Sequence, residues 1–247
     1  MKPFCTMLKT ELKLSLRGMD MVIFAICMPL VVFVILGVIY GDAPAFDGAG
    51  YTFLEQSFGG LTTISLCAGG LMGLPLVLSD YRSKKILKRF QVTPVSPGLI
   101  LLVQVVIYTL YALSSFLVLS LVGKAVWGVG LHGSPVLFLG GYLLVLLSLF
   151  SLGIMVGGIA PNAKIASVIA SILYFPMLLF SGATLPYEIM PAALQRAADL
   201  LPLTQGVKLL KAASLGLPIQ SVLPSLVVTA AIAACCTVIA LKFFRWE

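Results

Sequence analysis

Six long stretches without Asp, Glu, Lys or Arg most constrain the fold of this 247-residue chain. A helix needs roughly 20 mostly apolar residues to cross the hydrocarbon of a bilayer. Charged residues make up 10% of the chain, whereas soluble domains usually carry about 25%. The stretches are Met21–Gly41, the run between Glu55 and Asp80, Leu99–Val122, Ser134–Pro161, a run that Lys164 opens and that ends near Leu185, and Leu223–Leu241. The sequence therefore predicts an all-α integral membrane protein with six transmembrane helices in a single domain, residues 1–247.

The distribution of basic residues predicts the orientation of the six helices. An even number of spans places both termini on one side of the membrane. With the termini inside, twelve of the sixteen Lys and Arg residues lie in inner segments and four in outer segments. The positive-inside rule favours this arrangement, so we expect a multi-pass protein with both termini cytoplasmic.

Residues 1–20 show the pattern of an amphipathic helix that lies at the membrane interface. Apolar residues fall on one arc of a helical wheel and basic residues on the opposite arc, with Glu11 placed among the apolar ones. Such a helix buries its apolar arc in lipid and directs its cations toward the headgroups. The alternative is that the cations serve only to set the topology. The apolar residues are Phe4, Leu8, Leu12 and Leu16, and the basic ones are Lys9, Lys13 and Arg17.

The segment 80–98, between the second and third spans, combines five basic residues with apolar ones. Ile86, Leu87 and Phe90 lie among the cations, and Pro94 and Pro97 prevent a helix from continuing into the next span. Apolar side chains beside cations are suited to docking on a protein surface. The alternative is a patch that binds anionic lipids beside the membrane.

Several chemistries lack the residues that they need in this sequence. No Asp, Glu, Lys or Arg lies in the middle of a span, where ion-coupled carriers usually need one. The five cysteines and the single His132 lack metal-type spacing, and no phosphate-binding loop motif is present. We therefore expect no catalytic, cofactor or metal site and no nucleic-acid partner. If this chain performs transport against a gradient, another polypeptide supplies the energy.

Two stretches resemble the signatures of permeases of the type-2 class of ABC exporters. "LKRFQVTPVSP", residues 87–97, resembles the family's basic cytoplasmic loop that ends in Thr-Pro. "LLFSGATLPYEIMPAALQRAADLLPLTQGVKLLKAASLG", residues 178–216, resembles the segment between the fifth and sixth spans. The matching positions of this second motif are Ser181, Gly182, Pro186, Pro191, Pro202, Leu203 and Thr204.

The resemblance implies a dimer in which each six-helix subunit docks on a cytoplasmic ABC ATPase subunit. The second permease would be another copy or a paralogue, and ATP and Mg would be bound by the ATPase rather than by this chain. Residues 1–20 would form a connecting helix, 80–98 a coupling loop, and 186–211 a re-entrant helical segment in the outer leaflet. The family also implies the plasma or inner membrane of a prokaryote, with lipids as further partners. The coupling residues would be Arg82, Lys84, Leu87, Lys88, Phe90, Thr93 and Pro94.

The sequence departs from the family pattern at Ser83, Lys85, Ile86, Gln205 and Lys211, where other residue types are frequent. These departures bear on the individual coupling contacts and leave the two motifs recognisable.

Polar residues in the third and fifth spans are candidates for a substrate path, although interhelical hydrogen bonding is the commoner use of such groups. They are Gln104, Tyr108, Tyr111, Ser115, Ser171 and Tyr174. We expect an exporter of an amphiphilic drug, antimicrobial or lipid-like substrate. The alternatives are an exporter of a polysaccharide or lipid-linked glycan, an ATP-independent channel or carrier, and a membrane anchor without transport activity.

Overall fold

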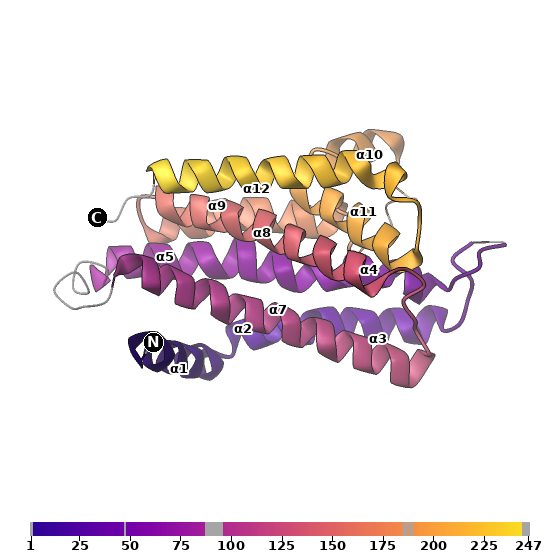
Figure 1. Cartoon of the computed structure of the whole chain (residues 1–247), viewed down its shortest axis with the longest axis horizontal. Helices are drawn as coiled ribbons and strands as arrows, with labels where there is room; N and C mark the ends of the chain where they lie inside the picture. The colour runs from indigo at the N-terminus through magenta and orange to yellow at the C-terminus, as the bar shows by residue number, and fades with distance from the viewer. Residues whose placement is uncertain (1, 47, 87–95, 185–186, 188–189, 244–247) are drawn as a thin grey trace.

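Six helices, some of them composite, are long and apolar enough to cross a membrane in the described part of the chain, which confirms the six predicted spans. The computed structural model describes residues 2–46, 48–86, 96–184, 187 and 190–243 (Figure 1). Span 1 comprises α2 (Asp20–Val22), η1 (Ile23–Cys27) and α3 (Met28–Tyr40), and span 2 comprises α4 (Phe53–Cys67), η2 (Ala68–Gly73) and α5 (Leu74–Ser83). Spans 3 to 6 are α7 (Pro97–Trp127), α8 (Pro135–Ile159), α9 (Ala163–Phe180) and α12 (Leu223–Phe243).

The bundle has two distinct ends. The last described residues of the C-terminus, the N-terminal helix α1 (Lys2–Gly18), the end of α5 and the start of α7 gather at one end, which we call the termini end (Figure 1). The connection between α3 and α4 and the short helices α10 (Ala192–Ala198) and α11 (Pro202–Leu215) lie at the other, the far end. This arrangement has both termini on one side, as an even number of spans requires.

Span 2 is the central helix of the bundle. In its most apolar window 83% of the residues are buried, against 22% in the corresponding windows of spans 1 and 6. Two glycines allow other helices to approach it closely. A Cβ at Gly59 would lie 2.7 Å from the backbone nitrogen of Lys211 in α11, and one at Gly153 would lie 2.9 Å from the carbonyl carbon of Gly70. Small residues thus let α8 and α11 pack directly against span 2, as is common between membrane helices.

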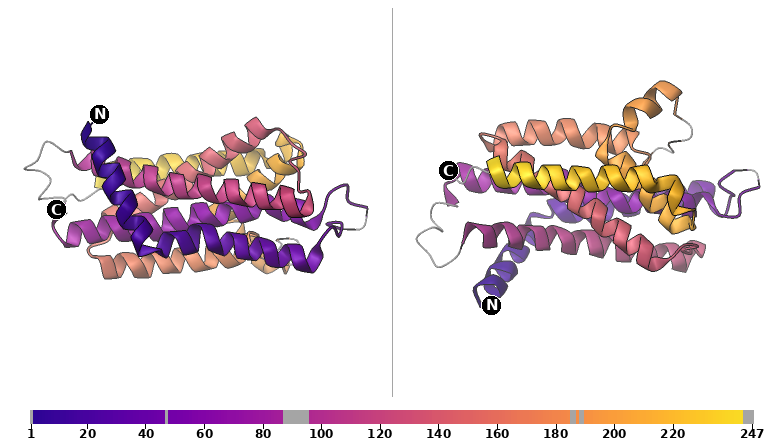
Figure 2. Two further views of the ribbon diagram at one scale, coloured as in Figure 1. Left: turned by 90° about the horizontal axis from the view of Figure 1, so that it is seen from below. Right: turned by 45° about the horizontal axis from the view of Figure 1, so that its top comes forward.

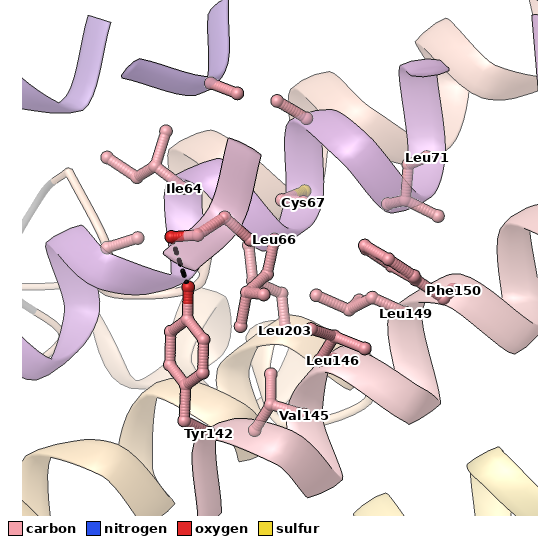
Figure 3. Packing of buried hydrophobic residues seen from close by; sticks show 14 of the residues in the cluster. Ile64, Leu66, Cys67, Leu71, Tyr142, Val145, Leu146, Leu149, Phe150 and Leu203 are labelled. Carbon is pink, nitrogen blue, oxygen red and sulfur yellow. Dashed lines mark hydrogen bonds between the residues drawn. The ribbon is translucent and has the colours of Figure 1, made fainter. Parts of the chain in front are cut away.

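The core between span 2, α7 and α8 is mostly apolar, with a few buried polar groups (Figure 3). Tyr142 on α8 is almost fully buried, and its hydroxyl donates a hydrogen bond of 2.9 Å to the backbone carbonyl of Ala112 on α7. A buried tyrosine hydroxyl usually finds such a partner, because leaving it unpaired would cost free energy. The labelled residues around it include Ile64, Leu66, Leu149 and Leu203.

Spans 1 and 2 each contain a widened π-helical segment shortly before a proline. η1 precedes Pro29 and η2 precedes Pro75. A proline inside a helix removes one backbone donor and its ring clashes with the preceding turn, and a wider turn accommodates both effects. The two π segments contact each other, so the first two spans are irregular at the same level of the bundle.

The N-terminal helix α1 crosses the long axis of the bundle at a steep angle (Figure 2, left). A left-handed turn at Met19, with φ of 59°, separates it from α2. Its residues Phe4, Leu8 and Leu12 pack against the core of the bundle, while its basic residues after Cys5 are exposed. The helix itself is therefore present, with Leu16 of the predicted apolar arc exposed. Its amphipathic position at a membrane interface stays a prediction.

The chain between spans 5 and 6 forms α10 and α11, followed by the short 3-10 helix η4 (Ile219–Val222). α10 projects from the bundle (Figure 2, right). α11 turns back along α4 and α8 and buries most of its residues there. Its depth in the outer leaflet stays a prediction.

Candidate functional site

A cavity of about 620 Å³ lies at the termini end, between α1, the first three spans and the start of α9. Ligand sites in proteins usually measure about 300–1,000 Å³ and are mostly apolar with a few polar groups. The cavity reaches from α1 up to both π segments, because Phe24 of η1 and Met72 and Gly73 of η2 form part of its wall. We call it the α1 cavity.

Most of the wall of the α1 cavity is apolar. Met21 and Phe24 come from span 1, and Met72, Leu76 and Val77 come from span 2. Methionine side chains adapt to differently shaped ligands because they are unbranched and polarizable. The wall can therefore hold an apolar body without requiring one particular shape.

A hydrogen-bond network closes one side of the α1 cavity and joins three helices. The Tyr81 hydroxyl on α5 donates to Glu11 Oε2 on α1. Gln104 Nε2 on α7 donates to the same carboxylate oxygen over 3.1 Å and to the Tyr81 hydroxyl over 3.3 Å. This network explains why an acidic residue interrupts the apolar arc of α1: Glu11 points toward the bundle and not toward lipid. A nearby contact of 3.0 Å between the Ser15 and Tyr111 hydroxyls also links α1 to α7.

Two further carboxylates line the α1 cavity, Asp20 at the start of α2 and Asp80 near the end of α5. Lys84 Nζ lies 2.8 Å from Asp80 Oδ2, in a pair whose lysine side chain is largely exposed. The two aspartates mark the limits of spans 1 and 2 in the sequence, and the fold places both of them beside Glu11 at one cavity.

The six residues predicted for a substrate path are distributed over several sites. Gln104 and Tyr108 line the α1 cavity. Tyr111 bonds to α1, Ser115 is buried on α7, Tyr174 is buried beside Met28, and Ser171 is half-buried on α9. Of the six, Gln104 and Tyr108 belong to the wall of the α1 cavity and the other four do not. A path through all six stays a prediction.

Of the predicted coupling residues, the structure describes Arg82 and Lys84. Arg82 is buried, and its Nη1 donates a hydrogen bond of 2.8 Å to the carbonyl of Gly158 in the last turn of α8. A cation there satisfies a carbonyl that has no partner within the helix and opposes the negative end of the helix dipole. Arg82 thus joins α5 to α8, and its contact with an ATPase stays a prediction. Leu87, Lys88, Phe90, Thr93 and Pro94 lie outside the described residues.

The second motif lies at the far end, where α9 ends and α11 begins. Ser181 is fully buried and its Oγ accepts a hydrogen bond of 3.2 Å from the backbone of Ala183. Gly182 has φ of 89°, a conformation that favours glycine. Pro202 is the first residue of α11, where its missing N–H costs nothing. Thr204 is buried in the same turn, and Pro191 is exposed before α10. Pro186 lies outside the described residues.

A polar cluster at the far end connects Asp199, which follows α10, with α11. Asp199 Oδ1 lies 2.6 Å from Lys208 Nζ and accepts a hydrogen bond of 2.8 Å from the Tyr187 hydroxyl. Burial raises the pKa of Asp199, but the hydrogen bonds from Lys208 and Tyr187 outweigh it and hold this pKa below its usual value. For Lys208 the two effects have opposite signs: burial lowers its pKa, but the hydrogen bond to Asp199 outweighs burial, so the pKa of Lys208 is raised.

This far-end cluster borders a second cavity of about 130 Å³. No three His, Cys, Asp or Glu side chains come together as a metal site in the part of the chain that the structure describes.

The fold and the α1 cavity define the class of protein: a multi-pass helical membrane protein with a ligand-sized cavity between its N-terminal helix and its first spans. The sequence profile of the ABC-2 type transporter family matches residues 2–215. The chain therefore belongs to that family, which confirms the resemblance seen in its two motifs.

Curated relatives agree with this assignment. Nodulation protein J of Rhizobium leguminosarum bv. viciae is 32% identical over 106 residues, which are 43% of this chain and 39% of that protein. Inner membrane transport permease YhhJ of Escherichia coli K12 is 30% identical over 194 residues, which are 76% of this chain and 51% of that protein. The chain thus spans about two-fifths to half of the length of these relatives.

Proposed function

We propose that this chain is the permease of an ATP-driven exporter that moves an amphiphilic drug, antimicrobial or lipid-like substrate out of the cell. A separate cytoplasmic subunit would bind ATP and Mg and hydrolyse the ATP. The observation that carries the proposal is the α1 cavity, whose walls are mostly apolar and whose polar groups gather beside α1 and the ends of spans 1 and 2. An amphiphile has the matching division into an apolar body and a polar head.

The position of the α1 cavity supports its coupling to an ATPase. Tyr81 directly precedes Arg82, the first residue of the predicted coupling set, and its hydroxyl is bonded to Glu11. A displacement of segment 80–98 by an ATPase would therefore act on Tyr81, and through Glu11 and Gln104 on α1 and α7. These three helices form walls of the α1 cavity, so such a displacement would change its shape.

Export would also require a second permease, either another copy or a paralogue. Large apolar side chains are exposed along span 1, α9 and α12, for example Val38, Ile172 and Val238. These faces are suited to lipid or to another apolar helix bundle, and pairing along one of them would form the predicted dimer.

The alternative functions predict a different composition of the cavity wall or a different source of energy for transport. A polysaccharide path would require many polar and aromatic groups, whereas apolar side chains from spans 1 and 2 dominate the wall of the α1 cavity. A channel or carrier would move solute without an ATPase.

The test is to purify the tagged chain from its native membrane in mild detergent and to identify the ATP-binding subunit that co-purifies. We expect the ATPase activity of this complex to rise on addition of an amphiphile such as dodecyltrimethylammonium and to be unaffected by a soluble oligosaccharide. Stimulation by the oligosaccharide alone would favour the glycan alternative. Absence of any ATP-binding subunit from the purified material would contradict the proposal.

A further inference from the structure

We propose that the α1 cavity is a binding site for a cationic amphiphile, whose positive head is held by carboxylates while its apolar body lies against spans 1 and 2. The inference rests on the proposed function and narrows its substrate class. Three features of the cavity wall support it: the charges of the wall, the hydrogen-bond partners of its carboxylates, and the aromatic rings that border the cavity.

Three carboxylates, those of Glu11, Asp20 and Asp80, belong to the wall of the α1 cavity. No Lys, Arg or His is among the described residues that line it. The exposed Lys84 pairs with Asp80 from outside the wall. The basic residues Lys13 and Arg17 on the neighbouring face of α1 are exposed and do not line the cavity. The wall is therefore acidic.

Glu11 is the carboxylate best placed to receive a ligand. Both of its hydrogen bonds come from neutral donors, the Tyr81 hydroxyl and the Gln104 amide, and both end on Oε2. Its second oxygen, Oε1, has no hydrogen bond from the described residues. A carboxylate that is partly removed from water without a cationic partner is unfavourable. A cation that enters the cavity relieves this cost, and an anion of the same shape increases it.

The uncharged part of the wall is also suited to a lipophilic cation. Tyr81 and Tyr108 border the cavity from spans 2 and 3, and Phe24 borders it from span 1. The faces of aromatic rings attract cations. Met21 and Met72 offer adaptable apolar contacts on the side of the two π segments. Charge, rings and apolar wall therefore indicate the same ligand chemistry.

The position of Asp20 suggests how the ligand reaches the site. Asp20 is exposed and is the first residue of span 1 after the turn at Met19. Phe24, one helical turn further, is also exposed while it lines the cavity. An amphiphile in the adjacent leaflet would therefore meet a carboxylate at the level of its head and an aromatic ring at the level of its body.

The test compares two ions of almost the same size and shape and opposite charge, tetraphenylphosphonium and tetraphenylborate. Binding of each is measured by equilibrium dialysis against the full chain in lipid nanodiscs, with partition into empty nanodiscs subtracted. We expect the cation to bind at least tenfold more tightly than the anion. Glu11→Gln and Asp20→Asn should each weaken cation binding about tenfold, the effect of one nearby charge at intermediate dielectric. Equal binding of the two ions, or tighter binding of the anion, would overturn the proposal.

Two further variants separate a site from a general charge effect. Asp42→Asn removes the same charge from an exposed position at the far end and should leave cation binding unchanged. Leu76→Trp keeps every carboxylate and fills the cavity, so it should reduce binding of the cation. If Asp42→Asn weakens binding as much as Glu11→Gln, or if Leu76→Trp has no effect, the α1 cavity is not the site.

Variants are compared only when their elution volume and melting temperature match the wild type. If Glu11→Gln does not fold, Asp20→Asn, at an exposed position, still tests whether a carboxylate contributes to cation binding. Because binding is measured without ATP or an ATPase subunit, its failure would leave the permease function standing. Conversely, failure to find an ATP-binding partner would leave a demonstrated binding site standing.

Discussion

Replacing Gly153 by alanine should separate α8 from the π segment η2. A Cβ at this position would overlap the carbonyl oxygen of Gly70 and would lie 2.9 Å from its carbonyl carbon. The obstacle is backbone, which cannot rotate away as a side chain can, so one of the two helices must shift. Overpacking of a close-packed interior costs about 1–3 kcal/mol. Met72 and Gly73, which follow in η2, line the α1 cavity, so the shift should also deform that cavity.

Gly140 provides a matched control on the same helix, because nothing lies within 4 Å of a Cβ built there. Replacing a helical glycine by alanine adds about 0.5–1 kcal/mol of stability at either position, and this gain cancels in the comparison. The difference in unfolding free energy between Gly153→Ala and Gly140→Ala, measured by titration with sodium dodecyl sulfate in mixed micelles, should therefore be about 1–3 kcal/mol. Equal stability of the two variants would show that α8 and η2 are not in backbone contact.

Three other predictions concern coupling, pH and topology. Phe90→Ala should lower co-purification of the ATPase more than Lys88→Ala does. A buried aromatic anchor is worth about 2 kcal/mol or more in binding, whereas an exposed ion pair is worth about 0–1 kcal/mol. If both variants retain the ATPase as well as the wild type does, this segment is only a topology and lipid-contact element. The pKa of Asp199 is lower in the folded state than in the unfolded state. The ionised carboxylate therefore stabilises the fold at pH values above its unfolded-state pKa of about 3.9, and this stabilisation is lost as the pH falls through its folded-state pKa. The melting-temperature advantage of the wild type over Asp199→Asn should accordingly shrink below about pH 4, and an advantage that persists at lower pH would contradict the assignment. With native cysteines removed, Ala193→Cys should react with an impermeant thiol reagent outside intact cells and Ser83→Cys should not; labelling at Ser83 would reverse the orientation.

The six spans could be predicted because they depend on composition alone. A run of about 20 uncharged apolar residues has few alternatives to a membrane helix, and each predicted run overlaps one of the six apolar helices of the structure. The prolines Pro29 and Pro75 indicate irregular helices. The widened turns that precede them could not be read from the sequence, because the hydrophobic pattern of a span that is apolar on most sides carries little periodicity.

The candidate site could be predicted only in part because its contacts join distant segments. Glu11 stands out on the helical wheel of α1, yet its partners are 70 and 93 residues away in the sequence. Asp20 and Asp80 are visible as the limits of spans, and only the fold shows that they share a cavity. Tyr81 was missed altogether, although a tyrosine beside an acidic residue at the end of a span was an available signal.

Arg82 illustrates the same limit for a charged residue. Its position in a basic segment favours exposure to solvent. The structure instead buries its guanidinium against the carbonyl of Gly158. The sequence shows how many cations a segment carries. Which of them is buried depends on where the C-terminal end of a neighbouring helix lies, because its carbonyl groups attract a cation.

The most direct test of the central claim is transport by the purified complex. The chain and its co-purified ATPase would be reconstituted in liposomes with the nucleotide-binding side facing outward, and the uptake of radiolabelled tetraphenylphosphonium would be followed with and without ATP. An ATP-driven exporter of cationic amphiphiles predicts accumulation inside the liposomes that requires ATP and the permease and is reduced in Glu11→Gln. Uptake at the same rate without ATP, or by the permease alone, would contradict the account and identify a channel or carrier.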